Sequence, residues 1–420
     1  MLIEARFANH RSIRSEQVLS LEAASGPKDD ERRREIPGYR GQLLPAAAIY
    51  GANASGKTNV LRAFEFMRSA VIESHRSWPP DGGVPRSPFA FDDARQEPSV
   101  FEVLFVADGV RYQYGFAASD SAFEEEWLYA WPHGRKQMWF EREGQDFRFG
   151  GKLGGEKKLV EQVTRPNSLF LSASVQLGQA QFQPVHGWFE ALVFRGQHKR
   201  LGPDDFKDSP HTFALATDTL AASLEEEPLD QRLSGMRKRF RRVLDLLKEA
   251  DIGISNVRLE DGETQEDASF FLQHGTPASD SWLSIKEESE GTKALFLLGP
   301  FILDALESGG VLCVDELESS LHPRLAAELI SKFNDPETNP RNAQLIFTTH
   351  DTQLLGTQLG NRPLRRDQVW LTEKDRDGAT SLYPLSDYKP RKDENLERGY
   401  LQGRYGAVPY LGELIAPMDP

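Results

Sequence analysis

Residues 51 to 58 read Gly-Ala-Asn-Ala-Ser-Gly-Lys-Thr, a complete phosphate-binding loop of the form G-x-x-x-x-G-K-[ST]. The apolar run Leu43 to Tyr50 leads into the loop as a strand would, and the residues after it have helical spacing. Both glycines suit a backbone that turns tightly and brings its N–H groups against phosphate oxygens. We expect Lys57 to reach the β and γ phosphates and Thr58 to offer its hydroxyl to Mg²⁺. The loop therefore predicts binding of a nucleoside triphosphate, and a chance glycine-rich turn is the weaker alternative.

Charge and composition limit the partners of this chain of 420 residues, which is long enough for two or three domains. The formal charge of −14 at pH 7 argues against a surface that coats nucleic acid indiscriminately, although a local basic face stays possible. The only cysteine, Cys313, cannot form an internal disulfide, and the N-terminus lacks a secretory signal, so we expect a cytoplasmic protein. The longest apolar run, Ala294 to Leu303, is too short to span a bilayer and predicts a core helix without membrane contact.

The first half of the chain contains strand-like and then helix-like segments. Short strands are expected between Leu2 and Leu21. Four apolar runs separated by glycine turns predict an antiparallel meander: Val100 to Val106, Val110 to Phe116, Trp127 to Trp131 and Gln137 to Arg142. Residues 157 to 247 are mostly helical in pattern and include a basic cluster from Arg237 to Arg242. That cluster could contact a nucleic acid backbone, but a solvated helix face is the simpler interpretation.

A second group of polar residues follows two buried strands in the second half of the chain. Val311 to Val314 is an apolar strand that ends in Asp315 and Glu316. Consecutive side chains at a strand end point in different directions, so Asp315 can join the Mg²⁺ shell while Glu316 faces the water that attacks the γ phosphate. His350 follows the strand Gln344 to Phe347, and the ends of parallel strands line one crevice. We therefore predict that the phosphate loop, this carboxylate pair and His350 converge, with His350 sensing the γ phosphate.

Taken in order, these parts resemble the ABC-type ATPases of the SMC, RecF and overcoming-lysogenisation-defect (OLD) group. Phe7 to Ile13 is similar to the N-terminal Asn-Phe-Arg-Ser element of that group, with His10 in place of the aromatic residue. Ser289 to Thr292 resembles the ABC signature but departs from its usual sequence, and Ser319 to His322 resembles the D-loop. His350 matches the switch histidine.

The resemblance implies an α/β fold: an ABC-type P-loop ATPase head with N-terminal strands, an inserted antiparallel β meander, a helical lobe and no long coiled coil. It implies Lys57, Glu316 and His350 as catalytic residues, and ATP and Mg²⁺ as cofactors. The residues implied to contact the nucleotide are Arg11, Ser12, Gly51, Asn53, Ser55, Gly56, Lys57, Thr58, Asn59, Ser289 and Gly291. The implied metal ligands are Thr58, Asp315 and, as the Q-loop glutamine, Gln176. In such ATPases the signature of one subunit closes over ATP held by another, which implies a head-to-tail dimer or a larger assembly.

The expected segments narrow the family further. We predict N-terminal strands and the P-loop part of the first lobe at 1–76, the meander at 77–156, a helical insertion at 157–250, the second ATPase lobe at 251–375 and a C-terminal tail at 376–420. Only about 230 residues separate the phosphate loop from the signature, without sustained heptads, so no coiled-coil arm is expected. The 70 residues after His350 lack an obvious catalytic acid cluster, so we expect no nuclease domain of the OLD type.

The chain's ending, with Gln368 to Lys374 and Thr380 to Asp387, resembles the compact bacterial AAA15-type ATP-binding proteins of anti-phage defence systems. That resemblance implies a separate toxin or nuclease effector as partner and a phage trigger. The alternative is a RecF-like repair clamp that binds duplex DNA in its ATP-bound form, which predicts strongly salt-dependent DNA binding. The glycines and tyrosines between Gly399 and Gly406 are expected to pack a turn-rich tail against the sheet.

Overall fold

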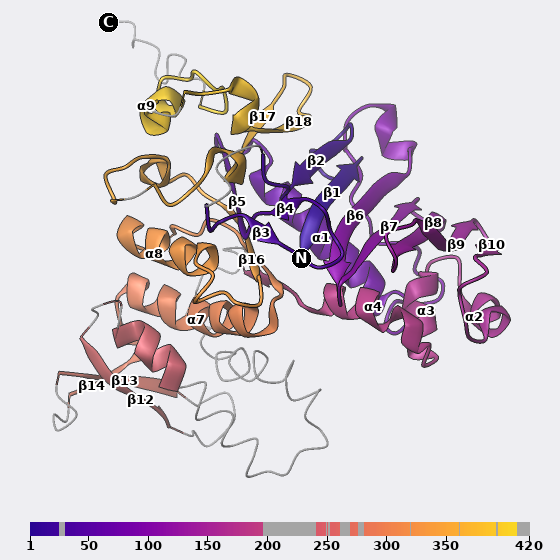
Figure 1. The fold of residues 1–420 in the computed structure, drawn as a ribbon, viewed down its shortest axis with the longest axis horizontal. Helices are drawn as coiled ribbons and strands as arrows, with labels where there is room; N and C mark the ends of the chain where they lie inside the picture. Colours follow the sequence, from indigo (N-terminus) through magenta and orange to yellow (C-terminus); the bar gives the residue numbers. More distant parts are fainter. Residues whose placement is uncertain are drawn as a thin grey trace, which may run out of the picture.

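The computed structural model describes residues 1–24, 30–195, 241–248, 250, 253–260, 269–275, 281–319, 321–360, 362–391 and 394–409. Its two largest sheets lie next to each other, with α7 and α8 on the side away from the antiparallel sheet (Figure 1). The α/β fold class expected from the sequence is confirmed. Among the described helices, none is long and apolar enough to cross a membrane.

The antiparallel sheet has seven strands in the order β10-β9-β8-β7-β6-β1-β2. Its strands are β1 (Leu2–Ala8), β2 (Gln17–Ser20), β6 (Ser99–Ala107), β7 (Val110–Ala118), β8 (Phe123–Trp131), β9 (Gln137–Glu143) and β10 (Asp146–Phe149). The predicted meander is confirmed. The N-terminal strands do not form a unit apart from it, because β1 pairs with β6 along almost its whole length.

The second sheet carries the phosphate loop and has the order β11-β15-β16-β5-β17-β18. Its strands are β5 (Ala46–Gly51), β11 (Leu192–Arg195), β15 (Val311–Val314), β16 (Gln344–Thr348), β17 (Val369–Lys374) and β18 (Thr380–Pro384). All neighbours are parallel except β17 and β18. The carboxyl ends of β5, β15, β16 and β17 therefore meet at one edge.

Alternation along β5 explains why helices cover both faces of the parallel sheet. Ala47 and Ile49 belong to a core shared with α1 (Lys57–Glu73) and the antiparallel sheet, whereas Ala48 and Tyr50 pack with α7 (Glu290–Ser308) and α8 (Pro323–Asn334). Successive side chains of a strand point to opposite faces, so a strand buried on both faces reads as one continuous apolar run.

The smaller described elements are α2 (Lys157–Val163), α3 (Phe170–Gln176), α4 (Gln183–Glu190), α9 (Leu396–Leu401), the pair β3 (Arg34–Glu35) and β4 (Gln42–Leu43), and the sheet β12 (Ile254–Glu260), β13 (Ser269–His274) and β14 (Trp282–Ser284).

Two strands lie where the sequence pattern predicts something else. β11 falls inside the stretch expected to be helical, and its four residues are too short a pattern to recognise as a strand. β18 falls inside the expected tail yet pairs with β17 in the central sheet. Residues 196–240, which include the first part of the basic cluster, lie outside the described residues; Arg242 of that cluster forms an ion pair with Glu307 of α7.

Candidate functional site

The phosphate loop is held from behind by hydroxyl groups of the last two strands. Thr372 of β17 hydrogen-bonds the Ser55 hydroxyl at 2.6 Å, and Thr380 of β18 donates to the Ser55 carbonyl at 2.8 Å. Ser12 lies within 2.7 Å of the Thr380 hydroxyl and accepts a hydrogen bond from Asn59 at 2.6 Å. These contacts fix the loop in one conformation, and residues as distant in sequence as 12 and 380 contribute to it.

Gly56, the second glycine of the loop, is required by both conformation and space. Its φ is 106°, and a Cβ atom there would lie 2.1 Å from the Thr380 hydroxyl. We expect Gly56→Ala to lower the free energy of unfolding by about 2–3 kcal/mol and to abolish nucleotide binding. Thermal denaturation and calorimetric titration would measure both effects. Gly144→Ala is the matched control because Gly144 also has a positive φ, 59°, but nothing lies within 4 Å of an added Cβ; an equal loss in both variants would argue against a packing role for Gly56.

Lys57 begins α1 and folds its ammonium group back over the loop. Its Nζ donates to the Gly51 and Ala52 carbonyls, both at 3.0 Å. Burial lowers the pKa of Lys57, while the nearby Glu316 and Asp315 carboxylates act in the opposite direction. The ammonium thus has two weak acceptors that it can exchange for phosphate oxygens, which are stronger partners for a cation.

Thr58 and the carboxylate after β15 are already in contact. The Thr58 hydroxyl is 3.0 Å from both Asp315 carboxylate oxygens, and Thr348 of β16 donates to Asp315 at 2.7 Å. Among the described residues, no group of three or more His, Cys, Asp or Glu side chains could hold a metal. One hydroxyl and one carboxylate suit Mg²⁺, which commonly takes only one or two carboxylates and fills its shell with phosphate oxygens and water. The donor set therefore fits a Mg²⁺–nucleotide complex.

Glu316 is placed by an unusual backbone conformation. Its φ is 54°, in the left-handed region that glutamate seldom adopts, and its N–H donates to the Thr348 hydroxyl at 2.7 Å. Thr348 thus orients Asp315 through its hydroxyl hydrogen and Glu316 through its oxygen. Strained backbone held by its surroundings is common at functional sites.

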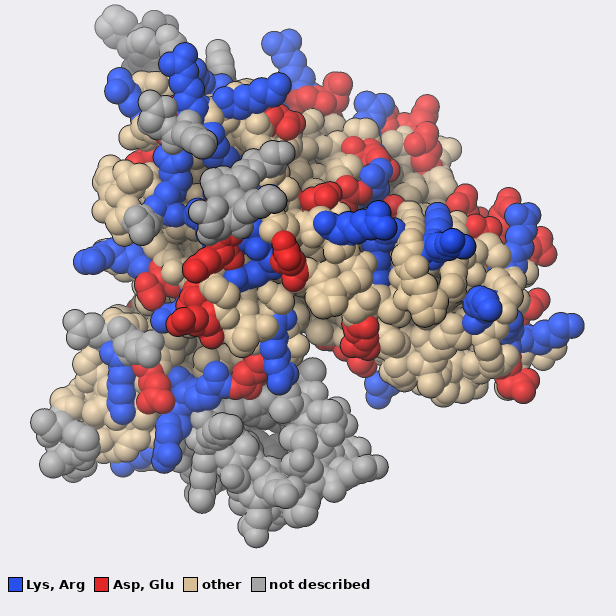
Figure 2. All heavy atoms as spheres, viewed as in Figure 1, with Lys and Arg blue, Asp and Glu red and all other residues tan. Residues whose placement is uncertain are grey.

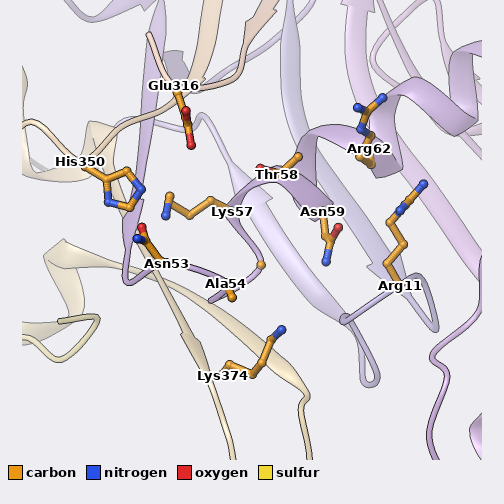
Figure 3. A pocket seen from close by; sticks show the side chains of 11 residues that line it. Arg11, Asn53, Ala54, Lys57, Thr58, Asn59, Arg62, Glu316, His350 and Lys374 are labelled. Atoms are coloured by element: carbon orange, nitrogen blue, oxygen red, sulfur yellow. The ribbon is translucent and has the colours of Figure 1, made fainter. Parts of the chain in front are cut away.

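His350 lies at the same end of the site as Glu316, near the Lys57 amine (Figure 3). Its backbone N–H donates to a Glu318 carboxylate oxygen at 2.5 Å. Burial, with the nearby Lys57 cation, lowers the pKa of the His350 ring. The ring is therefore neutral at pH 7 and can donate one hydrogen bond into the cleft.

An open cleft of about 700 Å³ joins these groups, a size usual for a small-molecule site. It is lined by Arg11, Asn53, Ala54, Gly56, Lys57, Thr58, Asn59, Arg62, Glu316, His350 and Lys374. Figure 3 shows the Lys57 amine, Glu316 and His350 toward one end and Arg11 and Arg62 toward the other. The expected convergence of the loop with Glu316 and His350 is present in this arrangement.

Two lining cations were missed by the sequence reasoning. Lys374 ends β17, so the rule that located Asp315 and His350, a polar residue at the end of an apolar parallel strand, also applies to it. Arg62 stands four residues after Thr58 on α1, where helical spacing places it on the same face.

Some predicted site residues do not line this cleft. Ser12 and Ser55 support the loop from behind, and Gly51 turns it against Thr372. Ser289 and Gly291 lie at the start of α7, where Ser289 is exposed and accepts a hydrogen bond from the Thr292 N–H at 3.1 Å. Gln176 is exposed at the end of α3, whose first residues contact Ser74 and His75 at the far end of α1. Neither the start of α7 nor Gln176 lines the cleft of the same chain, and Gln176 is not retained as a metal ligand.

His10 stands where the resembling family has an aromatic residue, and its ring packs as an aromatic side chain would. It is buried, stacks on Phe66 at 6.1 Å between ring centroids and meets Phe101 edge-on at 5.3 Å. Burial, with the neighbouring Arg11 cation, lowers its pKa to about 3, so the ring is neutral. The tail residues likewise pack as expected: Tyr400 and Tyr405 are buried in the core that contains Tyr50.

Comparison with known proteins gives a family and distant structural likenesses. Residues 46–356 match the family model described as AAA domain, putative AbiEii toxin, Type IV TA system. No curated protein matches the chain. One similar solved structure is an Smc head bound to the C-winged helix domain of ScpA, with 14% sequence identity, coverage of 91% of this chain and 97% of that chain, and a TM-score of 0.44. Another is the SMC head domain from Thermotoga maritima, with 13% identity, coverage of 91% of this chain and 98% of that chain, and a TM-score of 0.41. A third is the Smc head domain with an extended coiled coil bound to the C-terminal domain of ScpA, derived from Pyrococcus furiosus. It has 13% identity, coverage of 96% of this chain and 98% of that chain, and a TM-score of 0.41.

Proposed function

Because this chain belongs to the family of AAA domains described as putative AbiEii toxins of type IV toxin–antitoxin systems, we propose that it binds and hydrolyses ATP with Mg²⁺ and thereby controls a separate effector. One observation carries the hydrolytic part of this proposal. Thr58 and Asp315, from distant parts of the chain, touch at 3.0 Å beside the Lys57 ammonium, with Glu316 on the same cleft. This is the constellation that phosphoryl transfer requires, because the reaction depends on positioning and charge neutralisation.

Each residue has a distinct role in the proposed reaction. Lys57 leaves the loop carbonyls and binds the β and γ phosphates, while Thr58 and Asp315 would hold Mg²⁺. When bound, this ion would neutralise charge at the phosphates. Glu316 accepts a hydrogen bond from the attacking water and orients it, and neutral His350 donates to a γ-phosphate oxygen. Asn53 and Asn59, which also line the cleft, contribute further polar contacts to the triphosphate.

The exposed start of α7 supports a site completed by a second copy. Ser289 and Gly291 lie outside the cleft of their own chain, yet the hydroxyl and free N–H groups of a helix start suit a phosphate. We assign them to the γ phosphate of ATP bound by another subunit. The functional unit is then a head-to-tail dimer, or a larger assembly built from it.

Dimer formation gives a direct prediction. Glu316→Gln protein should be a dimer with ATP and a monomer with ADP or without nucleotide, because ATP that is not hydrolysed keeps the two surfaces joined. Adding Ser289→Arg should keep the protein monomeric with ATP, since a bulky side chain then blocks the start of α7. Light scattering after size exclusion measures the mass. Ser308→Arg at the other end of α7, which is also exposed, is the control and should leave the dimer intact. Formation of the ATP dimer by the Ser289→Arg variant would show that Ser289 does not lie in the interface.

We propose that the assembly regulates a toxin or nuclease effector in phage defence. The support is the family description, which names a toxin of a type IV system, together with the ATP-dependent surface that a dimer would create. Affinity capture during phage infection tests it, with Glu316→Gln protein as bait and Lys57→Ala protein as the nucleotide-free control. A small toxin or nuclease retained by one form only is the expected result. Recovery of DNA and repair proteins in its place would replace this role with that of a DNA clamp.

Net charge gives the DNA clamp no general support, because the formal charge is −14 at pH 7. On the face seen in Figure 2, basic side chains of the described residues gather in the upper left part, near α9, and elsewhere they are interspersed with acidic side chains. The phosphate contacts of a duplex-binding protein would need clustered Lys and Arg side chains. The family description supports a toxin-related role, so we keep effector control as the single proposed role.

A further inference from the structure

Phe91 is an aromatic side chain that the fold holds in an exposed position. It is 61% exposed, whereas its neighbour Phe89 is buried at 1%. The two rings meet edge-on with centroids 5.5 Å apart, and a Cβ atom added to Gly378 would lie 3.0 Å from the Phe91 ring. Phe91 is therefore supported from two sides, while most of its surface is left to solvent. Large aromatic groups kept in this way commonly serve as contact surfaces.

The segment that carries Phe91 contacts two turns, and a cationic residue in or next to each turn lines the nucleotide cleft. The Arg11 N–H donates to the Ser87 carbonyl at 2.7 Å, and the Phe89 N–H donates to Asn9 at 2.9 Å. On the other side, Gly378 belongs to the turn that begins directly after Lys374. Arg11 and Lys374 both line the cleft. Phe91 is not itself among the residues that line the cleft, but it is linked through short segments to two of the cations that do.

The end of the cleft that carries Arg11 and Arg62 is where the nucleoside would lie. Figure 3 shows Lys57, Glu316 and His350 toward the opposite end, so in the proposed function the γ phosphate would lie there and the rest of the nucleotide would extend toward Arg11 and Arg62. Apart from His350 at the hydrolytic end, the lining within the described residues contains no aromatic ring. The cleft itself therefore supplies cations for phosphate and ribose oxygens but no surface for a flat base.

We propose that Phe91 is the stacking surface for the base of the bound nucleotide, with Arg11, Arg62 and Lys374 holding the α phosphate and ribose next to it. This inference rests on the proposed function, because it concerns the nucleotide of that site. Stacking on a phenyl ring does not read the hydrogen-bonding edge of a base. The site consequently accepts purine nucleoside triphosphates as a class, and ATP and GTP should bind within about threefold of each other.

The test compares ATP with inorganic tripolyphosphate, which has the same phosphates and no nucleoside. Calorimetric titration in Mg²⁺ with full-length Glu316→Gln protein avoids turnover. We expect Phe91→Ala to weaken ATP binding about tenfold and to leave tripolyphosphate binding unchanged, whereas Phe91→Tyr retains wild-type ATP affinity. Leu401→Ala is the control, since Leu401 is equally exposed at 61% but lies on α9.

Three results would overturn the proposal. Unchanged ATP affinity in Phe91→Ala removes the ring from the site, and an equal loss for ATP and tripolyphosphate shows that the variant disturbs the phosphate loop. A preference for ATP over GTP of a hundredfold or more would mean that a base edge is read elsewhere. Failure of the proposed function is a separate outcome: the protein with Phe91 intact would then bind neither ATP nor tripolyphosphate.

Discussion

Replacing Glu316 by glutamine is expected to reduce ATP turnover at least about a hundredfold while leaving ATP affinity within twofold of wild type. The amide keeps the shape of the carboxylate but no longer draws a proton from the attacking water. ATP affinity stays because Lys57, Thr58 and Asp315 are untouched, and the Glu316 N–H still donates to Thr348. Phosphate release measures turnover, and calorimetric titration measures affinity.

A surface glutamate provides the matched control for this substitution. Glu328 on α8 is 61% exposed at its side chain and forms an ion pair with Lys332 in the next turn, so Glu328→Gln should leave turnover unchanged. Wild-type hydrolysis by Glu316→Gln protein would show that another group activates the water. Loss of ATP binding along with turnover would mean that Glu316 contributes to holding the nucleotide.

Replacing Lys57 by alanine should weaken ATP binding by about 3 kcal/mol, roughly a hundredfold, because the triphosphate loses its central cation. The ammonium contacts only the Gly51 and Ala52 carbonyls in the described residues, so the variant should unfold within a few degrees of wild type. Titration with ATP and a thermal scan measure the two quantities.

Lys332→Ala is the control for loss of one positive charge, since Lys332 is a surface residue of α8. Its ATP affinity should equal that of wild type. Lys57→Ala protein that binds ATP normally would contradict the assignment of this loop to the triphosphate. A large fall in its unfolding temperature would instead make Lys57 a structural residue of the loop.

The hydrolytic end of the site was accessible from sequence because its parts follow a local rule. Each polar group comes directly after an apolar strand, and parallel strands bring their carboxyl ends to one edge. Asp315, Glu316 and His350 could be located in this way, and their contacts with the loop follow from the sheet order β15-β16-β5. Lys374 obeys the same rule, but its strand was grouped with the C-terminal part of the chain.

The supports of the loop and the nucleoside end could not be predicted because they depend on long-range packing. Thr372 and Thr380 reach the loop only because β17 and β18 extend the sheet beyond β5, a pairing that no local pattern encodes. Phe91 is likewise defined by its contact with Gly378, nearly three hundred residues away. The family resemblance implies Gln176 as the Q-loop glutamine, but the packing of α3 against the end of α1 leaves it outside the cleft.

The most direct measurement of the central claim is phosphate release from ATP by the wild-type protein over a range of protein concentrations, with Mg²⁺ or with EDTA. We expect hydrolysis that requires Mg²⁺, with a rate per chain that rises with protein concentration, since a second copy completes each site. A rate per chain that is independent of concentration would contradict the shared site. No release above the EDTA background at any concentration would contradict the assignment of this cleft to ATP hydrolysis.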